Sequence, residues 1–305
     1  MSETAPAEKA IVECVPNFSE GRDMAVVDAL AAVVKETAGV ALLDRTSDAD
    51  HNRTVLTIAG EAAGIIEAAV RLGGVAAERI DLRRHTGVHP RLGAMDVCPL
   101  VPVSGLTMAH CAELAQWVGN RLWLEHRIPV FFYEEAALSE DRRKLEDVRR
   151  GAVRREMWPD IGGPEPHASA GASVVGARKF LIAYNINLDT DEAGVARDIA
   201  RAIRASNGGL PAVKALGLEL ASEGIVQVSM NLVDYELTGI EAVFEAVEAA
   251  ARAHGVAVRE SELIGLAPAA ALNERVAERV KLRDWSGAMI LENRLAAMSY
   301  PKRAG

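Results

Sequence analysis

Apolar residues recur along the first half of the chain in two patterns, one of short runs and one of helical spacing. Val26, Val27, Leu30, Val33 and Val34 repeat at intervals of three and four residues, which predicts an amphipathic helix. The short apolar runs between such segments predict strands. The expected elements are a strand over 11–15, a helix over 24–37, strands over 40–43 and 54–59, a helix over 61–78, a strand over 94–103, a helix over 107–127 and a strand over 128–136.

Local signals at the ends of these elements refine the prediction. Ser19 or Asp23 could cap the first helix, since each offers a side-chain oxygen to the first backbone amides. The strand that holds Pro99 and Pro102 is expected to pair poorly in the interior of a sheet, because proline donates no hydrogen bond. The segment over 155–178 is rich in glycine and proline, so we expect it to be mostly loop.

The second half of the chain repeats the element order of the first. The expected elements are a strand over 179–188, a helix over 191–205, strands over 211–221 and 225–235 joined by a turn at 222–224, a helix over 238–254 and a strand over 256–265. Strand-helix-strand-strand-helix-strand is the order of a split βαβ, or ferredoxin-like, unit. The first half shows this order with a further helix and strand appended.

The predicted fold class is therefore α/β (α+β), with two ferredoxin-like subdomains, each a mixed or antiparallel sheet backed by helices. We expect a disordered tail over 1–10, an N-terminal subdomain over 11–177, a C-terminal subdomain over 178–270 and a helical addition over 271–305.

Composition and charge narrow the class of protein. At 305 residues with half of them apolar, the chain can bury a large core. A net charge of -9 and the absence of a basic tract make a nucleic-acid partner unexpected. No apolar run reaches the length of a membrane span, and Cys14, Cys98 and Cys111 form no CxxC pair. We expect a cytoplasmic protein without a membrane partner, and Cys98, in an apolar strand, as a buried structural thiol.

The stretch over 83–103 concentrates ionisable groups, and glycine and proline interrupt it too often for a regular helix. It presents two histidines and three arginines, namely His85, His89, Arg83, Arg84 and Arg91. The four-residue spacing of the histidines would suit a metal pair only on a helix, so we expect no metal. A histidine among cations tends toward its neutral form, which can act as a general base. Alternatively, both histidines serve only as hydrogen-bonding groups of the loop.

Three other segments are candidates for binding. The polar segment over 44–53 leads into DHNRTV, where Arg53 offers a planar fork matched to a carboxylate; an ordinary polar turn is the alternative. Backbone amides of PNFSEG (16–21) could hold an anion, although this signal is weak. The small residues over 162–172 permit close approach of a flat ligand. The charged segment over 141–150 is interpreted as a solvated helix face.

Five long segments carry a resemblance to a known family. VECVPNFSEGRD, LLDRTSDADHNRTVLTIAG, RRHTGVHPRLGAMDVCPLVPV, GASVVGARKFLIAYNINL and VSMNLVDYELTGIEAVFE follow in an order and spacing that resemble glutamate formimidoyltransferases. The resemblance covers roughly residues 11–270. It is to the free-standing form, without the cyclodeaminase domain that is fused to some relatives.

The resemblance implies a dimeric enzyme that moves a formimidoyl group from N-formimidoyl-L-glutamate to N5 of tetrahydrofolate, a step of histidine degradation and one-carbon metabolism. Tetrahydrofolate would be the acceptor substrate. His89, in the HPR triplet, corresponds to the catalytic histidine. The implied folate-binding residues are Gly162, Gly163, Pro164, Glu165, Pro166, His167, Ala168, Ser169, Ala170 and Gly171.

This sequence departs from the family pattern at two positions. Ala170 stands where some relatives carry an aromatic residue, so packing on the pterin ring is expected to use other side chains. Thr46 stands where some relatives carry a carboxylate, whose role would pass to Asp48 or Asp50.

A mechanism follows from the residues and the resemblance together. His89 takes the proton of the folate nitrogen as that nitrogen attacks the amidine carbon, then returns it to the departing glutamate nitrogen. Arg53, Arg91 and Arg178 are candidates for binding the substrate carboxylates, and Asp50 is a further substrate-binding candidate. A folate-binding regulatory module and a formimidoylglutamate hydrolase are the competing hypotheses.

Overall fold

The computed structural model describes residues 10–49, 51–86, 91–220 and 223–297, and the chain divides into two compact units between Arg178 and Lys179. Each unit has its own sheet and its own apolar core. The tail expected over 1–10 falls outside the described residues except for Ala10. His89 and Asp50 also lie outside them.

Unit 1 is a seven-stranded sheet with helices on both faces. Its elements are β1 (Ile11–Cys14), β2 (Asn17–Phe18), α1 (Met24–Glu36), β3 (Val40–Asp48), β4 (Arg53–Gly60), α2 (Ala62–Arg79), β5 (Met95–Ser104), α3 (Met108–His126), β6 (Val130–Glu134), α4 (Leu145–Val153) and β7 (Ser173–Ala177). β3 pairs with β4, β4 with β1, and β1 with β5, all antiparallel. This is the strand order of a ferredoxin-like unit.

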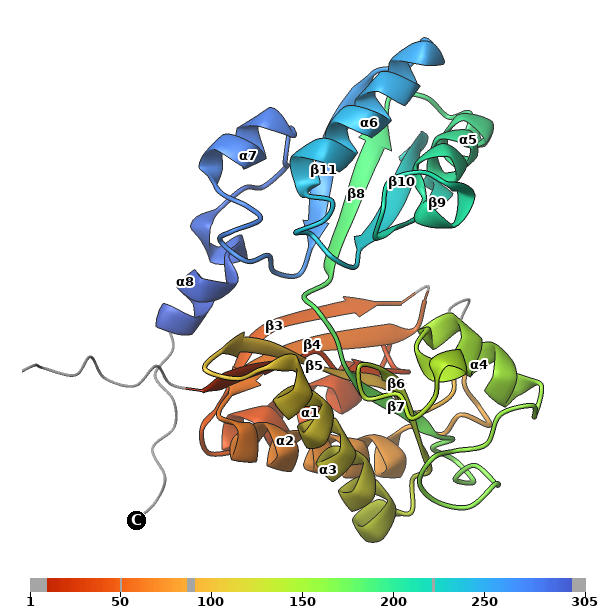
Figure 1. Cartoon of the computed structure of the whole chain (residues 1–305), viewed down its shortest axis with the longest axis vertical. Helices are drawn as coiled ribbons and strands as arrows, with labels where there is room; N and C mark the ends of the chain where they lie inside the picture. The colour runs from red at the N-terminus through yellow and green to blue at the C-terminus, as the bar shows by residue number, and fades with distance from the viewer. Residues whose placement is uncertain (1–9, 50, 87–90, 221–222, 298–305) are drawn as a thin grey trace, which may run out of the picture. The chain divides into compact units, whose positions relative to one another are not determined.

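Two strands extend this sheet beyond β5. β7 pairs with β5 and β6 pairs with β7, both in parallel. Phe132 packs in the core with residues of α1, α2 and α3, whereas its neighbours Phe131 and Tyr133 pack against Val148 of α4. Successive strand residues point to opposite faces, so α1, α2 and α3 cover one face and α4 the other (Figure 1).

The expectation that β5 pairs poorly was wrong, and the structure refines three other expectations for unit 1. The segment over 155–178 is mostly loop, as expected, and β7 lies near its end. β3 runs to Asp48, beyond the strand expected over 40–43 and into the polar segment over 44–53. Asp23, not Ser19, caps α1, by accepting a hydrogen bond from Ala25. β5 pairs on both sides despite its prolines, since the Pro99 carbonyl still accepts from Val15 N at 3.1 Å.

Unit 2 confirms the ferredoxin-like prediction for the second half. Its elements are β8 (Ile182–Leu188), α5 (Ala193–Ile203), β9 (Val213–Leu220), β10 (Ile225–Leu232), α6 (Ile240–Ala253), β11 (Val258–Ile264), α7 (Glu274–Arg279) and α8 (Leu291–Ala296). The four strands lie in the order β11-β8-β10-β9 and all pairs are antiparallel. The turn expected at 222–224 lies partly outside the described residues.

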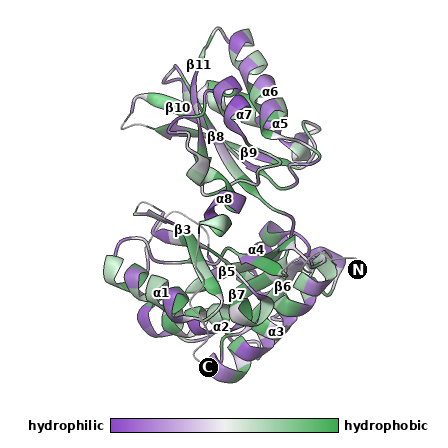
Figure 2. Ribbon diagram, turned by 90° about the vertical axis from the view of Figure 1, so that its left-hand side faces the viewer, coloured by the Kyte–Doolittle hydropathy of each residue, from purple (hydrophilic) through white to green (hydrophobic). Residues whose placement is uncertain are grey.

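Burial follows the hydropathy pattern in each unit. Apolar residues are concentrated along the strands, and the helices alternate between apolar and polar sides (Figure 2). Cys14, Cys98 and Cys111 are free and buried, which confirms the expectation that Cys98 is a buried thiol. No helix in the described part of the chain combines the length and the apolar character that crossing a membrane requires.

Candidate functional site

The candidate site of unit 1 begins at a β-bulge in β5. Asn17 of β2 is opposite Val97 and Phe18 is opposite Met95, so Asp96 has no partner in the ladder. The Asp96 side chain is only 3% exposed. Its Oδ1 accepts a hydrogen bond from Leu92 N at 2.6 Å, and its Oδ2 accepts one from Arg149 of α4. The bulge therefore directs a buried carboxylate at α4 and at the loop that precedes β5.

The turn between β3 and β4 brings Arg53 to the same place. Asn52 adopts a left-handed conformation with φ of 49°, which asparagine tolerates better than most residues. Its Oδ1 accepts from Gly21 N at 2.9 Å, and its Nδ2 donates to the Thr86 carbonyl at 3.0 Å. These bonds fix the turn between two other loops, and Arg53 follows directly and donates to Asn17 Oδ1.

The arginines of the site repel one another around Asp96. Burial lowers the pKa of Arg53 to about 10; the Asp96 charge opposes that shift, and the charges of Arg149 and Arg91 add to it. Arg53 still carries its charge at neutral pH. Asp96 is thus close to three guanidinium groups, and these four side chains together have an excess of positive charge. Such a cluster is suited to an anionic ligand.

Arg91 and His85 form a second part of the site. Burial lowers the pKa of Arg91, with Asp96 opposing the shift and Arg22 adding to it. Arg91 donates to Nδ1 of His85. Nε2 of His85 lies 3.2 Å from the Asn52 carbonyl oxygen. His85 thus joins Arg91 to the β3–β4 turn.

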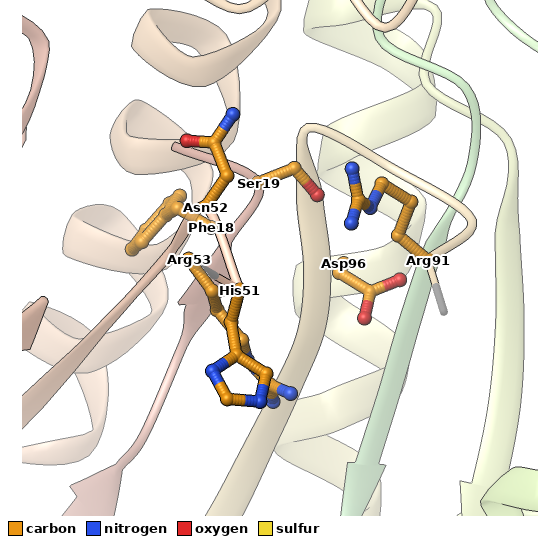
Figure 3. Close-up of a pocket in the computed structure, with 7 residues that line it drawn as sticks. All are labelled: Phe18, Ser19, His51, Asn52, Arg53, Arg91 and Asp96. Carbon is orange, nitrogen blue, oxygen red and sulfur yellow. The ribbon is translucent and has the colours of Figure 1, made fainter. Parts of the chain in front are cut away.

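A small pocket lies among these groups. It is lined by Phe18, Ser19, His51, Asn52, Arg53, Arg91 and Asp96. Figure 3 shows Arg91 and Asp96 on one side of it, and His51, Asn52 and Arg53 on the other. Ser19 donates to the Gly93 carbonyl at 2.8 Å, and His51 Nδ1 lies 3.0 Å from an Asp48 carboxylate oxygen. The pocket thus has cationic groups on both sides.

The segment over 162–171 packs beside this site. Ala94 N donates to the Ala170 carbonyl at 2.8 Å, and Leu82 N donates to the Ser169 carbonyl at 2.8 Å. Nδ1 of His167 accepts from Ala170 N at 3.1 Å, which closes the turn of the segment. The Ala170 side chain is 2% exposed and packs in the core. Backbone groups and His167 thus shape this segment, and the Ala170 methyl group offers no surface for a ring.

Arg178 lies elsewhere on the sheet. Its backbone N donates to the Leu100 carbonyl at 3.0 Å, four residues along β5 from Asp96, which is about 13 Å of strand. Burial raises the pKa of Tyr133, and the charge and hydrogen bond of Arg178 oppose that shift. The structure therefore brings Arg53 and Arg91 together, whereas Arg178 neighbours Tyr133.

Arg149, like its partner Asp96, is a site residue that the sequence did not predict. The segment over 141–150 was interpreted as a solvated helix face, which is wrong for Val148 and Arg149: Val148 is fully buried, and the Arg149 side chain is 16% exposed and paired with Asp96. The apolar spacing of Leu145, Val148 and Ala152 was an available signal of a buried side. Within the described ranges, no three histidine, cysteine or acidic side chains are close enough to hold a metal ion.

Comparison with known proteins covers both units. The family model "Formiminotransferase domain, N-terminal subdomain" matches residues 11–178, and "Formiminotransferase domain" matches residues 183–283. The chain is 45% identical to a glutamate formimidoyltransferase of Streptococcus pyogenes over 93% of this chain and 98% of that protein. It is 40% identical to one of Thermoplasma acidophilum, over 94% and 97%. A formimidoyltransferase-cyclodeaminase of Sus scrofa is 42% identical over 88% of this chain, but this chain covers only 52% of that protein.

Proposed function

Because this chain belongs to the formiminotransferase family, we propose that it transfers the formimidoyl group of N-formimidoyl-L-glutamate to N5 of tetrahydrofolate. The products are 5-formimidoyltetrahydrofolate and L-glutamate, and tetrahydrofolate is the acceptor substrate. The observation that carries the proposal is the similarity, over nearly the whole length of both chains, to two glutamate formimidoyltransferases. The reaction belongs to histidine degradation and one-carbon metabolism.

The arginine cluster supports this donor substrate. N-Formimidoyl-L-glutamate carries two carboxylates, and a guanidinium fork binds a carboxylate with two parallel hydrogen bonds. Arg53 and Arg91 line one pocket in which positive charge exceeds negative charge. We therefore assign the donor carboxylates to these two arginines. Asp50 lies between β3 and β4 in sequence, and we assign it to the amidine end of the donor.

The acceptor is assigned to the segment over 162–171, which packs against the strand residues that follow Arg91. Its backbone groups would contact the pterin, since Ala170 is turned into the core. Arg178 is separated from the donor arginines along β5, so we assign it to a carboxylate of the folate tail. All of these are proposed contacts of substrates.

His89 is the proposed base, and it precedes Arg91 by two residues in the chain. The N5 lone pair attacks the amidine carbon while His89 takes the N5 proton. The imidazolium then gives that proton to the glutamate nitrogen as the carbon–nitrogen bond breaks, so that glutamate leaves as a neutral amine. A group that exchanges one proton between two nitrogens needs a pKa near neutrality, as histidine has.

The experiment that tests the proposal measures glutamate release from N-formimidoyl-L-glutamate by the purified protein, with and without tetrahydrofolate. We expect release only with tetrahydrofolate, unaffected by a chelator. Changing His89→Ala should lower kcat by roughly 10²–10⁴-fold, the usual contribution of general acid–base catalysis. Glutamate released without tetrahydrofolate would indicate a hydrolase. Tight folate binding without turnover by either protein would indicate a binding module.

We further propose that the protein is cytoplasmic, as its composition suggests, and that it forms a homodimer, as the family resemblance implies. Light scattering of the purified protein should give twice the mass of one chain, and a monomer mass would contradict this proposal.

A further inference from the structure

The pair of Asp96 and Arg149 has no assigned role, although both side chains are largely buried. Arg149 comes from α4, on the face of the sheet opposite α1, α2 and α3. A buried ion pair contributes little net stability, because removing both charges from water offsets their attraction. Stability therefore does not explain why this ion pair lies next to the proposed substrate pocket.

We propose that Asp96 and Arg149 are positioning residues, through which α4 holds Arg91 and Arg53 in the geometry that binds the donor carboxylates. This inference rests on the proposed function. It names the structural support of the donor site rather than another contact with the substrate.

The two carboxylate oxygens of Asp96 accept hydrogen bonds from different parts of the chain. Oδ1 accepts from Leu92 N at 2.6 Å, which ties down the backbone directly after Arg91. Oδ2 accepts from Arg149. Leu92 is also three residues after His89 in the chain. Arg149 of α4 therefore holds the Asp96 carboxylate in place, and the carboxylate in turn holds the backbone next to Arg91.

Three arginines compete for the carboxylate of Asp96. The Asp96 charge attracts Arg53 and Arg91 as well as Arg149, since it opposes the fall in pKa of the first two. By occupying Oδ2, Arg149 competes with them for this partner. Without Arg149, a buried carboxylate would lose a charged hydrogen-bond donor, and the nearest replacements are the arginines of the pocket. Those arginines would then turn away from the substrate.

The β-bulge in β5 sets the direction of the Asp96 side chain. An unbulged β5 would place residue 96 in the ladder opposite β2, with its side chain perpendicular to the sheet. The extra residue between Met95 and Val97 re-aims this side chain instead. The local backbone thus departs from regular pairing to bring Asp96 to Arg149 and Leu92 together.

The test compares variants of the full chain by steady-state kinetics and thermal unfolding. Arg149→Met is expected to raise KM for N-formimidoyl-L-glutamate at least tenfold, with KM for tetrahydrofolate within twofold of wild type. Arg150→Met is the matched control, because Arg150 is the next residue of α4, is exposed and pairs only locally with Asp147 among the contacts described. Arg150→Met should leave kcat and both KM values unchanged. The double variant Asp96→Asn/Arg149→Met should be no worse than the poorer single variant.

Several results would overturn the inference. Wild-type kcat and KM values in a folded Arg149→Met variant would overturn it. A fall in kcat that matches the loss of folded protein, with both KM values unchanged, would also overturn it. If Arg149→Met does not fold, Arg149→Lys decides, since lysine keeps the charge but not the planar fork. A tenfold rise in donor KM in Arg149→Lys supports the inference, and wild-type values overturn it.

Wild-type turnover is measured first, because its absence would contradict the proposed function rather than this inference. If the wild type shows no turnover, calorimetric binding of N-formimidoyl-L-glutamate to the same variants replaces the kinetic comparison. Binding by wild type that weakens tenfold in Arg149→Met supports the positioning role, and equal binding overturns it.

Discussion

A cation buried beside two other cations is expected to oppose folding, and Arg53 is in this position. Burial lowers its pKa to about 10, so at every pH below that value the folded state carries a cost for keeping Arg53 charged. Asp96 reduces this cost, and the charges of Arg149 and Arg91 increase it. The arrangement makes sense if the charge is needed for a substrate rather than for the fold.

Arg53→Met should therefore separate stability from activity. We expect the free energy of unfolding to stay within about 1 kcal/mol of wild type or to rise, because removing Arg53 relieves its burial cost and its repulsion by Arg149 and Arg91, while Asp96 keeps Arg149 as a partner. KM for N-formimidoyl-L-glutamate should rise roughly 10²-fold, as for loss of a charged hydrogen-bonding partner. Urea unfolding and initial rates measure the two quantities. A variant that loses several kcal/mol but keeps wild-type KM would show that Arg53 is structural.

At the residue scale, sequence reasoning identified groups but not their partners. Arg53 and Arg91 were chosen for their chemistry, and the structure places both at one pocket. Asp96 and Arg149 were not assigned, because an acid in an apolar strand and an arginine in a charged helix gain meaning only when a bulge and a helix bring them together. Such pairing is tertiary, so no local pattern records it. His89 stays a prediction.

Among the loops that hold the site, the one around Gly21 leaves no room for a side chain. A Cβ atom on Gly21 would lie 2.3 Å from the Asp48 carbonyl oxygen and 2.6 Å from Arg53 N. Both atoms belong to backbone that cannot move independently of the β3–β4 turn. The close approach of this loop to the turn is what requires glycine there.

Gly21→Ala is expected to destabilise unit 1 by about 1–3 kcal/mol, the usual range for overpacking, and to raise donor KM by moving Arg53. Gly194→Ala is the control, since Gly194 is exposed in α5 and no atom lies within 4 Å of a Cβ built on it. Urea unfolding with kinetics of both variants checks the prediction. Equal stability of the two variants would contradict it.

At the element scale, two strands escaped prediction, the two-residue β2 and the longer β7. The sequence of β7, SVVGA, lies among glycine and alanine and has no alternating pattern. Gly176 is needed because the Tyr133 ring packs against it: a Cβ there would lie 2.4 Å from Tyr133 Cδ1. Both faces of β7 are buried, so small residues serve packing rather than chain reversal. The composition that indicated a loop is thus a requirement of close packing.

At the scale of the whole molecule, unit 2 has everything that a folding domain requires. It contains a complete ferredoxin-like sheet with a core of its own, in which Tyr184, Phe244 and Val228 are buried. We expect the fragment 179–297, expressed alone, to unfold cooperatively in urea and to show no formimidoyl transfer. Circular dichroism provides the measurement. A fragment without a cooperative transition would show that unit 2 depends on the rest of the chain.

The order of elements predicted the ferredoxin-like part of both units, because hydrophobic periodicity reports local structure and the split βαβ order permits few topologies. It did not predict how the first unit is extended. One further helix and strand were expected, whereas α3, β6, α4 and β7 follow β5. Nothing in the sequence of β6 shows that its neighbour comes from residues some forty positions later.

The place of β7 between β5 and β6 has a consequence for synthesis on the ribosome. β6 is made before β7, yet β7 is its ladder partner among the named strands. Until residues 173–177 have emerged, the apolar VFFY run of β6 is an edge that can pair with another nascent chain. A message truncated shortly before codon 173 would thus yield an aggregating product, although six of the seven strands would already be translated.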